Sequence, residues 1–273
     1  MHCYAKKCKD AIEYAENLQI KRGIKSNTGM TRKILTFYMG NIAVTVVGCL
    51  VYGTYKHGFP SRVSYPNLDV DMKTAPVNHC IMWVLQAFTC FYAGAGNAGP
   101  DGAMMLIISI IVNFGNRLKE LLNNIGVNPK DDYIILREAV EMHVIIIELS
   151  DKVVKAFRFV LLCQLIFTIT HTCIIVFAVT KVDDLGLIMT SLMPILVAAY
   201  FQLFVFSYAG EILLNMSEDL RFSAYDNQWY NMSVENRKHL ILLVEASKRT
   251  LSFESYGIIR ACYETCLNVS TIH

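Results

Sequence analysis

The sequence predicts an all-α membrane protein, a polytopic bundle of transmembrane helices with helical extensions in the cytosol. Of its 273 residues, 54% are apolar and only 18% are charged, against about 25% charged residues in ordinary soluble domains. The missing charges are concentrated, because Ile34–Tyr55, Phe159–Thr180 and Leu185–Gly210 contain no Asp, Glu, Lys or Arg. Since about 20 apolar residues span the ~30 Å hydrocarbon core, each stretch is long enough to cross a bilayer.

A further crossing is predicted at about residues 79–101. The region from Thr74 to Asn116 is free of charge except at Asp101, but it is too long for one span, and a separate span after Asp101 would be too short. The distribution of basic residues decides between the two topologies. Eight Lys and Arg residues precede the first span, three follow it, and seven lie between the second and third spans. One lies between the third and fourth spans, and six follow Gly210. This alternation predicts four spans with a cytosolic N-terminus.

The four spans divide the chain into three regions. We expect a cytosolic segment over residues 1–33, a transmembrane bundle over residues 34–212, and a cytosolic region with the start of a further helix over residues 213–273. The spans are predicted at about residues 34–55, 79–101, 159–180 and 185–210, with cytosolic helices over residues 102–158 between the second and third spans.

The N-terminal segment carries eight basic residues and three acidic ones. Its apolar residues have the spacing of a weak amphipathic helix, which glycines then interrupt. A membrane-surface helix and a solvated loop that leads into the first span both fit this pattern, and we expect the loop. The residues concerned are Ala5, Cys8, Ile12, Ala15 and Leu18, followed by Gly23 and Gly29.

The predicted cytosolic helices are apolar enough to need a protein core. Met104–Leu118 lies beyond the membrane in this topology, so it must be buried against other protein. Asp131–Arg158 is predicted to be helical and to continue into the third span, because acidic residues crowd its first turn and apolar residues repeat with helical spacing. Subunits could meet at such a bundle, although packing within one chain would also satisfy the pattern. The repeating residues are Ile135, Val140, Val144, Ile147 and Val154.

The residues that carry chemistry do not indicate an enzyme. Nine cysteines are scattered without the paired spacing of a zinc site, and no nucleophile, metalloprotease or phosphate-loop motif occurs. We therefore expect no metal, no cofactor and no catalytic residue. Asp101 and His171 are ionisable groups near or within a span, which makes them functional candidates. Structural hydrogen bonding is the alternative interpretation for both.

An ordered set of short motifs resembles the insect odorant receptor family from about residue 30 onward. The motifs that resemble the exit of the family's sixth helix are Gln202–Phe204, Tyr208–Glu211, Ser217-Glu218, Ala224-Tyr225 and Trp229-Tyr230. Those that resemble its last cytosolic helix are Arg237-Lys238 and Leu240–Ala246, and those that resemble its fourth helix are Trp83–Gln86, Phe91-Tyr92, Asn97–Gly99 and Asp101.

This resemblance implies a function and a set of partners. It implies a subunit of a tetrameric, odorant-gated, non-selective cation channel in the plasma membrane, with its N-terminus inside. Subunits would join through a cytosolic anchor of helix extensions, and a common odorant co-receptor subunit would be the partner. The family has seven spans, so the resemblance also implies a partial chain that covers helices three to six and begins the seventh, the pore helix.

The resemblance further implies an apolar odorant pocket in the outer half of the membrane. Lipid contact or helix packing is the alternative for every candidate residue. The candidates for the pocket are Val47, Val51, Tyr55, Met82, Gln86, Thr89, Met189, Met193 and Leu196, and those for the subunit-joining anchor are Trp229, Tyr230, Leu240 and Leu243.

Three other functions stay open. An inactive receptor fragment fits an unfinished last helix. A small transporter should show repeated halves with broken helices and midplane charges, which the sequence lacks. A G-protein-coupled receptor needs its N-terminus outside, against the eight basic residues that precede the first span.

Overall fold

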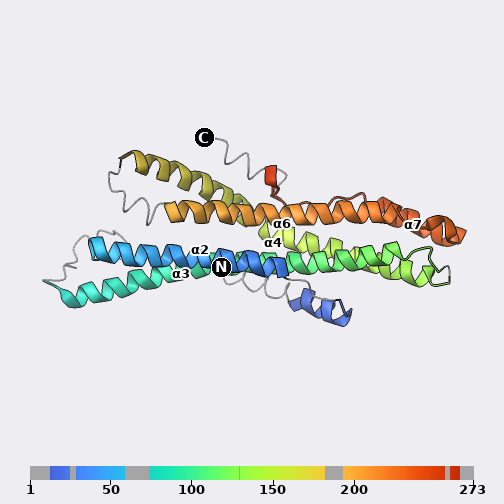
Figure 1. Cartoon of the computed structure of the whole chain (residues 1–273), viewed down its shortest axis with the longest axis horizontal. Coiled ribbons are helices and arrows are strands. Elements are labelled where there is room, and N and C mark those ends of the chain that lie inside the picture. Colours follow the sequence, from blue (N-terminus) through green and yellow to red (C-terminus); the bar gives the residue numbers. More distant parts are fainter. Residues whose placement is uncertain are drawn as a thin grey trace. The chain divides into compact units, whose positions relative to one another are not determined.

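The computed structural model describes residues 13–24, 29–58, 74–128, 130–181, 193–255 and 259–264. Helices dominate it, as Figure 1 shows, and the predicted all-α class is confirmed. Residues 13–21 are helical. The other helices are α2 (Gly29–His57), α3 (Pro76–Asn123), α4 (Asp132–Lys181), α6 (Met193–Tyr225), the 3-10 turn η2 (Trp229–Asn231) and α7 (Val234–Ala246). Strands β1 (Glu254–Ser255) and β2 (Ile259–Arg260) form one antiparallel pair.

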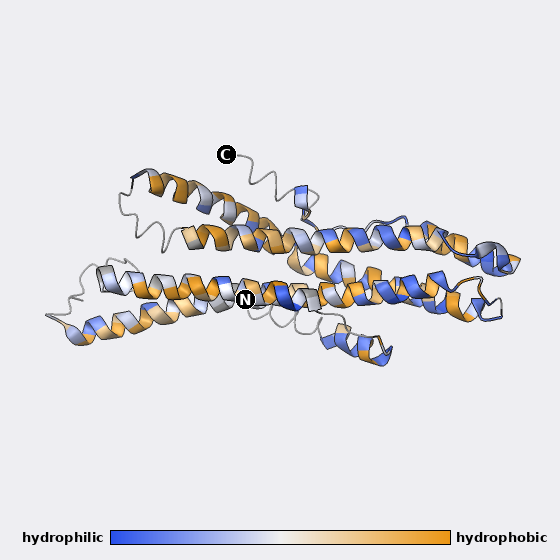
Figure 2. Cartoon of the chain, viewed as in Figure 1, coloured by the Kyte–Doolittle hydropathy of each residue, from blue (hydrophilic) through white to orange (hydrophobic). Residues whose placement is uncertain are grey.

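The long helices continue well past their charge-free stretches. Helix α4 has 50 residues and passes without a break into the stretch that begins at Phe159, as predicted. Helix α3 has 48 residues and continues through Pro100. Figure 2 shows that α4 changes along its length from mixed hydropathy to mainly hydrophobic residues. One helix therefore supplies both a membrane stretch and a polar extension.

Three helical stretches in the described part of the chain are long and apolar enough to cross a membrane. They are Thr31–Tyr55, Asp132–Lys181 and Ile195–Asn231. Helix α3 is not among them, so the span at about residues 79–101 stays a prediction. Residues 182–192 lie outside the described residues, and with them lie the start of the predicted fourth span and most of the turn before it.

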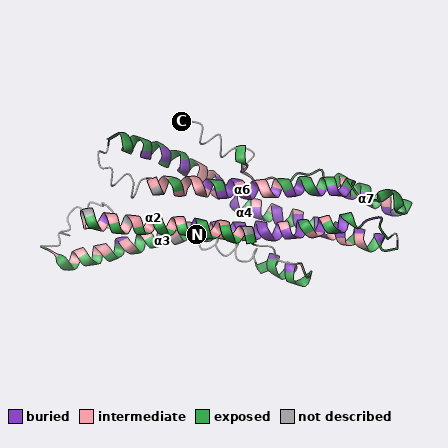
Figure 3. Cartoon of the chain, in the orientation of Figure 1, coloured by how far each residue is buried: buried purple, intermediate pink, exposed green. Residues whose placement is uncertain are grey.

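The chain divides into two compact units. The first unit comprises Met1–Thr31, Ala103–Gln164 and Phe204–His273, and the second comprises Arg32–Gly102 and Leu165–Leu203. Helices α3, α4 and α6 contribute long segments to both units, whereas α2 belongs to the second unit except for residues 29–31. Figure 3 shows buried residues along the part of α3 that belongs to the first unit, whereas α2, in the second unit, is mostly exposed or half-buried.

The core of the first unit is built on the apolar stretch of α3. Met104, Ile108, Ile111, Phe114 and Leu118 are each at most 2% exposed. The prediction that this stretch is buried against other protein is therefore confirmed. Removing such side chains from water stabilises a fold by roughly 1.5 to 3 kcal/mol each, so this stretch contributes much of the unit's stability.

The buried face of α4 differs from the repeat that predicted the helix. Val140 and Val144 of that repeat are exposed, and the other three members are only half-buried. The core instead takes a neighbouring row of residues, so the prediction of the helix is confirmed while the repeat that predicted it is not the buried face. Because α4 has apolar residues on two sides, periodicity alone could not select one. The buried residues are Leu136, Ala139, Met142, Ile146, Leu149, Val153 and Phe157.

The N-terminal segment is not a solvated loop where the structure describes it. Residues 13–21 form a helix within the first unit, and Ala15 and Gln19 are buried. Tyr14 lies under the ammonium group of Lys152, 4.5 Å from the ring centroid. The expectation of a loop was therefore wrong for these residues, which pack on the protein through the weak amphipathic pattern noted in the sequence.

Candidate ligand-binding and subunit-contact sites

The predicted pocket residues of α2 share one uncovered helix face. Val47, Val51 and Tyr55 are 56%, 64% and 90% exposed, respectively. Their spacing of four residues places them one above another on the helix. This face is free, within the described residues, to contact lipid, a ligand or another helix.

The other predicted pocket residues have mixed surroundings. On α3, Gln86 is buried and Met82 is half-buried, while Thr89 is exposed and its hydroxyl donates to the carbonyl of Leu85 at 2.8 Å. On α6, Met193 and Leu196 are half-buried. Met189 lies outside the described residues. The role of these residues in ligand binding therefore stays a prediction.

Helices α2 and α3 pack closely in the second unit. A Cβ atom added at Gly94 of α3 would lie 3.0 Å from a methyl carbon of Ile42 and 3.2 Å from one of Val46, both on α2. The indole nitrogen of Trp83 on α3 donates to the hydroxyl of Thr54 on α2 at 2.9 Å. Close packing at Gly94 and the hydrogen bond from Trp83 thus hold α2 and α3 together, and these two helices carry six of the pocket candidates.

A buried carboxylate joins three helices of the second unit. Asp101 of α3 is 1% exposed, and Tyr38 of α2 is 2% exposed. The Tyr38 hydroxyl donates to Asp101 Oδ2 at 2.6 Å, and Gln202 Nε2 of α6 donates to the same oxygen at 2.7 Å. The structure therefore assigns Asp101 a hydrogen-bonded position. Sequence reasoning missed Tyr38, because no spacing rule relates residues that are 63 positions apart.

His171 is exposed on α4 and does not share this environment. Its ring lies 6.1 Å from that of Phe167, one turn earlier on the same helix. The sequence-based interpretation of His171 as a hydrogen-bonded structural residue therefore stays a prediction, and the contact that the structure shows is this ring contact on the helix surface.

An extended strap, residues 250–255, crosses the first unit after α7. The backbone N–H of Leu251 donates to Ser217 Oγ of α6 at 3.1 Å, and Phe253 stacks on Phe206 of α6 with ring centroids 6.4 Å apart. Ser255 Oγ donates to the carbonyl of Arg158 on α4 at 2.6 Å. Ser217, one of the motif residues in the sequence, is thus explained by the strap that it receives.

A tight turn presents the aromatic pair Trp229 and Tyr230. Gly126, which follows α3, has a φ of +79° and lies directly beneath the carbonyl of Gln228. The side-chain amide of Asn231 donates to the carbonyl of Gly126 at 3.2 Å. From α7, the Arg237 guanidinium donates to the carbonyl of Tyr230 at 3.1 Å. Loop and helix contacts therefore fix a pair whose rings meet edge to face at 6.2 Å.

The four predicted anchor residues fall into two classes. Trp229 and Tyr230 are 43% and 61% exposed, whereas Leu240 and Leu243 of α7 are buried within the first unit. The opposite face of α7 exposes Ile241 and Leu242, at 66% and 68%. A subunit-contact surface on α7 would therefore use that opposite face together with the aromatic pair, a possibility that helical periodicity did not indicate.

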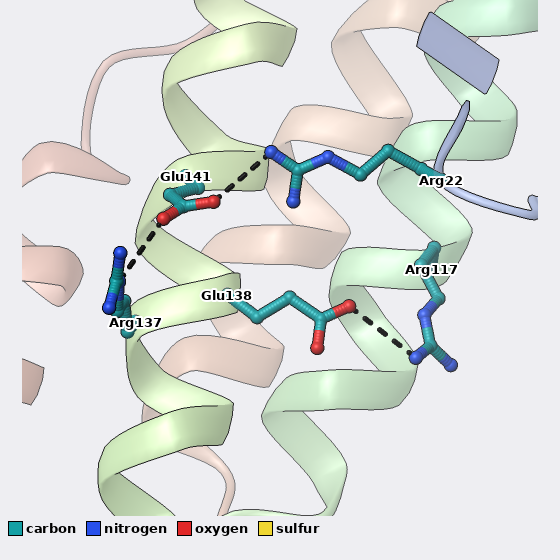
Figure 4. A network of polar contacts seen from close by, with 5 residues as sticks. All are labelled: Arg22, Arg117, Arg137, Glu138 and Glu141. Atoms are coloured by element: carbon teal, nitrogen blue, oxygen red, sulfur yellow. Dashed lines mark hydrogen bonds and ion pairs between the residues drawn. The ribbon is translucent and has the colours of Figure 1, made fainter.

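A polar network connects the N-terminal segment to the extensions of α3 and α4 (Figure 4). Arg22 donates to Glu141 at 3.1 Å, Arg137 donates to the same carboxylate at 3.3 Å, and Arg117 pairs with Glu138 at 3.5 Å. The hydrogen bond from Arg22 is the main cause that holds the pKa of Glu141 below its ordinary value. Glu141 lies well before the charge-free stretch at Phe159, so this network is outside the part of α4 that the sequence predicts to span the membrane.

Comparison with known proteins gives the same family for nearly the whole chain. The model of the 7tm Odorant receptor family matches residues 6–270. Odorant receptor 49a of Drosophila melanogaster is 24% identical over 258 residues, which cover 89% of this chain and 63% of the relative. The Odorant receptor coreceptor of Harpegnathos saltator is 26% identical over 170 residues, or 56% of this chain and 36% of the relative. The chain thus spans less than two thirds of these curated relatives.

Solved structures show the same fold. The olfactory receptor OR5 of Machilis hrabei, in complex with eugenol, superimposes with a TM-score of 0.72 at 13% identity, over 99% of this chain and 76% of that chain. A second structure of the same receptor gives a TM-score of 0.69 at 11% identity. The chain belongs to the 7tm odorant receptor family, a family of multi-pass membrane receptors and not of enzymes.

Proposed function

We propose that this chain is an odorant receptor subunit that works with a co-receptor subunit in an odorant-gated, non-selective cation channel. The observation that carries the proposal is the family match over residues 6–270. The relative that is itself an odorant co-receptor supports the same subunit architecture. The chain's own contribution would be the odorant site and a surface on which the partner subunit docks.

The proposed orientation places the N-terminus and the extensions of α3, α4 and α6 in the cytosol of the cell. The alternating Lys and Arg counts support it, because basic residues concentrate in cytosolic loops. Two glycosylation sequons test it, since Asn215 and Asn231 are both exposed. In the proposed orientation neither residue meets the glycosylation machinery, so neither carries a glycan. A glycan on Asn215 or Asn231, detected by mass spectrometry, would contradict the orientation.

The odorant site is proposed on the facing parts of α2, α3 and α6. Exposed apolar residues on α2 and the buried amide of Gln86 on α3 provide the mixture that ligand pockets use, a mainly apolar lining with few polar groups. The Machilis hrabei receptor was solved with eugenol, a small phenol. Eugenol is therefore a reasonable first probe for this chain, within a wider panel of volatile odorants.

The partner surface is proposed at the turn that carries Trp229 and Tyr230 and at the neighbouring face of α7. Both rings are exposed and meet edge to face, and the backbone of the turn that carries them is hydrogen-bonded to Arg237 and, through Asn231, to Gly126. Large aromatic side chains held in one conformation are typical of binding hot spots, because little entropy is lost when they are buried. Ile241 and Leu242 extend this surface with apolar area.

The proposal is tested by recording from cells that express this chain with an insect odorant co-receptor. Application of the odorant panel should evoke an inward cation current that exceeds the current from co-receptor alone. The same cells allow affinity purification, in which the co-receptor should be recovered with this chain. Recovery without current would favour the alternative of an inactive receptor fragment.

A further inference from the structure

The hydrogen bonds of Asp101 place two donors on a single carboxylate oxygen. Tyr38 Oη lies 2.6 Å and Gln202 Nε2 lies 2.7 Å from Oδ2. Ionisable groups buried at membrane depth are costly unless they are paired or hydrogen-bonded. Hydrogen bonds to an ionised acceptor are about twice as strong as those between neutral groups. The two bonds are therefore a strong restraint on the three helices that meet here.

The packing beside the carboxylate leaves little room for the helices to slide. Phe201, next to Gln202 on α6, lies 5.0 Å from the ring of Phe37 and 5.8 Å from the ring of Tyr38, both on α2. A shift of one helix by a single residue moves it by about 1.5 Å along its axis. A slide across a bond of this length would lengthen it to about 3.0 Å, and a movement of the same size along the bond would lengthen it to about 4.1 Å, beyond hydrogen-bonding distance. Movement of α2 or α6 against α3 therefore weakens or breaks one of the two bonds.

The same three helices carry every proposed odorant residue except Met189, which lies outside the described residues. On α2, Val47 lies nine residues, roughly 13 Å, from Tyr38, and on α6, Leu196 lies six residues, roughly 9 Å, from Gln202. Gln86 lies fifteen residues, roughly 22 Å, from Asp101 along α3. A ligand that separates or tightens these helices at its own site must therefore act on the bonds to Asp101.

We propose that Asp101 is a positioning residue for the odorant response. Through Tyr38 and Gln202 it holds α2 and α6 on α3 in the resting receptor, and odorant binding works against one of these two bonds. A ligand shifts a conformational equilibrium only by its different affinity for the two states. Loss of a bond that exists in only one of the states therefore changes the odorant concentration for half-maximal response. This inference rests on the proposed function.

The test compares odorant dose–response curves of variants expressed with the co-receptor, with the amount of each variant at the cell surface measured in parallel. The substitutions are Tyr38→Phe, Gln202→Leu and Asp101→Asn. Each should shift the half-maximal concentration at least threefold at an unchanged surface amount. The double variant of Tyr38→Phe and Asp101→Asn should shift it by less than the product of the two single shifts. Both changes act on the same bond, since Tyr38→Phe removes its donor and Asp101→Asn replaces its charged acceptor with a neutral amide.

Tyr92→Phe is the matched control, since it removes the same hydroxyl from an exposed tyrosine on α3. It should leave the curve unchanged. If Asp101→Asn does not reach the surface, the variants Tyr38→Phe and Gln202→Leu still decide, because each leaves the carboxylate one donor. Curves within twofold of the original chain for both, or shifts that multiply in the double variant, would overturn the inference while the proposed function stands. A silent original chain would instead contradict the proposed function itself.

Discussion

The carbonyl group of Ala261 lies directly over Gly210, so closely that a Cβ atom at position 210 would overlap it. The two residues join the buried face of α6 to the chain that follows β2. Tyr263, two residues further on, stacks on Phe204 of α6 with ring centroids 6.2 Å apart. The glycine of the Tyr208–Glu211 motif is thus required by a backbone contact and not by the flexibility of the helix.

Replacement of this glycine should destabilise the fold. Gly210→Ala adds a methyl group where backbone must move, and overpacking of this kind typically costs about 1 to 3 kcal/mol. The thermal unfolding temperature of the detergent-purified chain should therefore fall. Gly96→Ala is the control, because a Cβ atom there meets nothing within 4 Å. Equal unfolding temperatures for the two variants would show that the contact with Ala261 is not close in solution.

The turn at Gly126, beneath Gln228, should be more sensitive to substitution by alanine than the open turn at Gly23. Gly126 and Gly23 both have positive φ, at +79° and +61°, but only Gly126 lies against another backbone. Substitution by Ala should cost about 1 to 2 kcal/mol at Gly23 from the left-handed conformation alone. Gly126→Ala should cost about 1 to 3 kcal/mol more, because the Cβ atom overlaps Gln228. Chemical denaturation of both variants measures the difference, and the account of this turn fails if Gly23→Ala is the more damaging.

The two faces of α7 should respond differently to truncation. Leu243→Ala removes a buried side chain and should lower stability by about 2 to 5 kcal/mol. Leu242→Ala, at an exposed position, should change stability by no more than about 0.5 kcal/mol, yet reduce recovery of the co-receptor in affinity purification. Trp229→Ala should reduce this recovery further, since aromatic anchors dominate interfaces. Full recovery with both exposed-face variants would remove this surface as the partner site.

The N-terminal helix should dock through Glu141 in a pH-dependent way. The pKa of Glu141 in the folded protein is lowered, mainly by the hydrogen bond from Arg22. The contribution of this ion pair to the stability of the docked N-terminal helix is therefore complete above the ordinary pKa of a glutamate. That contribution is lost as the pH falls through the lowered value. Protection of the 13–21 amides from hydrogen exchange should therefore be constant from pH 5 to 8 and fall in more acidic solution.

The corresponding substitution provides the control for this contact. Glu141→Gln should lower the same protection at neutral pH, whereas Glu120→Gln, which removes one of the two acidic partners of Arg117, should not. Protection that is identical in the two variants would contradict the role of the Arg22 ion pair.

The exposed face of α2 should control odorant sensitivity. Val51→Trp adds a large ring to the proposed pocket and should change the half-maximal odorant concentration at least threefold. Val176→Trp is the matched control, because Val176 is an exposed valine on α4, outside the candidate set. Dose–response curves that shift equally for both variants would argue for a general effect of a surface tryptophan and against a pocket on α2.

Much of the fold was predictable because its signals are local. Charge-free stretches identified the apolar helices, and the placement of Met104–Leu118 beyond the membrane required a core that the structure contains. The prediction of α4 followed from acidic residues at its start and from apolar residues that repeat with helical spacing. Each of these arguments uses neighbouring residues alone, which is why the sequence is sufficient for them.

The features that the sequence left open or predicted wrongly depend on tertiary contacts. Helix α4 is apolar on two sides, so the choice between Leu136 and Val140 as core residues is made by what packs against it. The N-terminal helix is stabilised by contacts of Arg22 with Glu141 and of Tyr14 with Lys152, which lie more than a hundred positions further along the chain. Similarly, the partner of Asp101 on α2 has no sequence signal. The role of the odorant-site candidates stays a prediction, because their positions on α2, α3 and α6 do not show which of them a ligand contacts.

Whole-cell recording of this chain expressed with an insect odorant co-receptor tests the proposed receptor function most directly. With surface expression of both subunits verified, we expect an odorant of the panel to evoke a current that reverses near 0 mV, as in a channel that does not select among monovalent cations. Co-receptor alone should give no such response to the same odorant. Surface-expressed subunits that co-purify, yet never respond to any odorant above the co-receptor background, would contradict the function proposed for this chain.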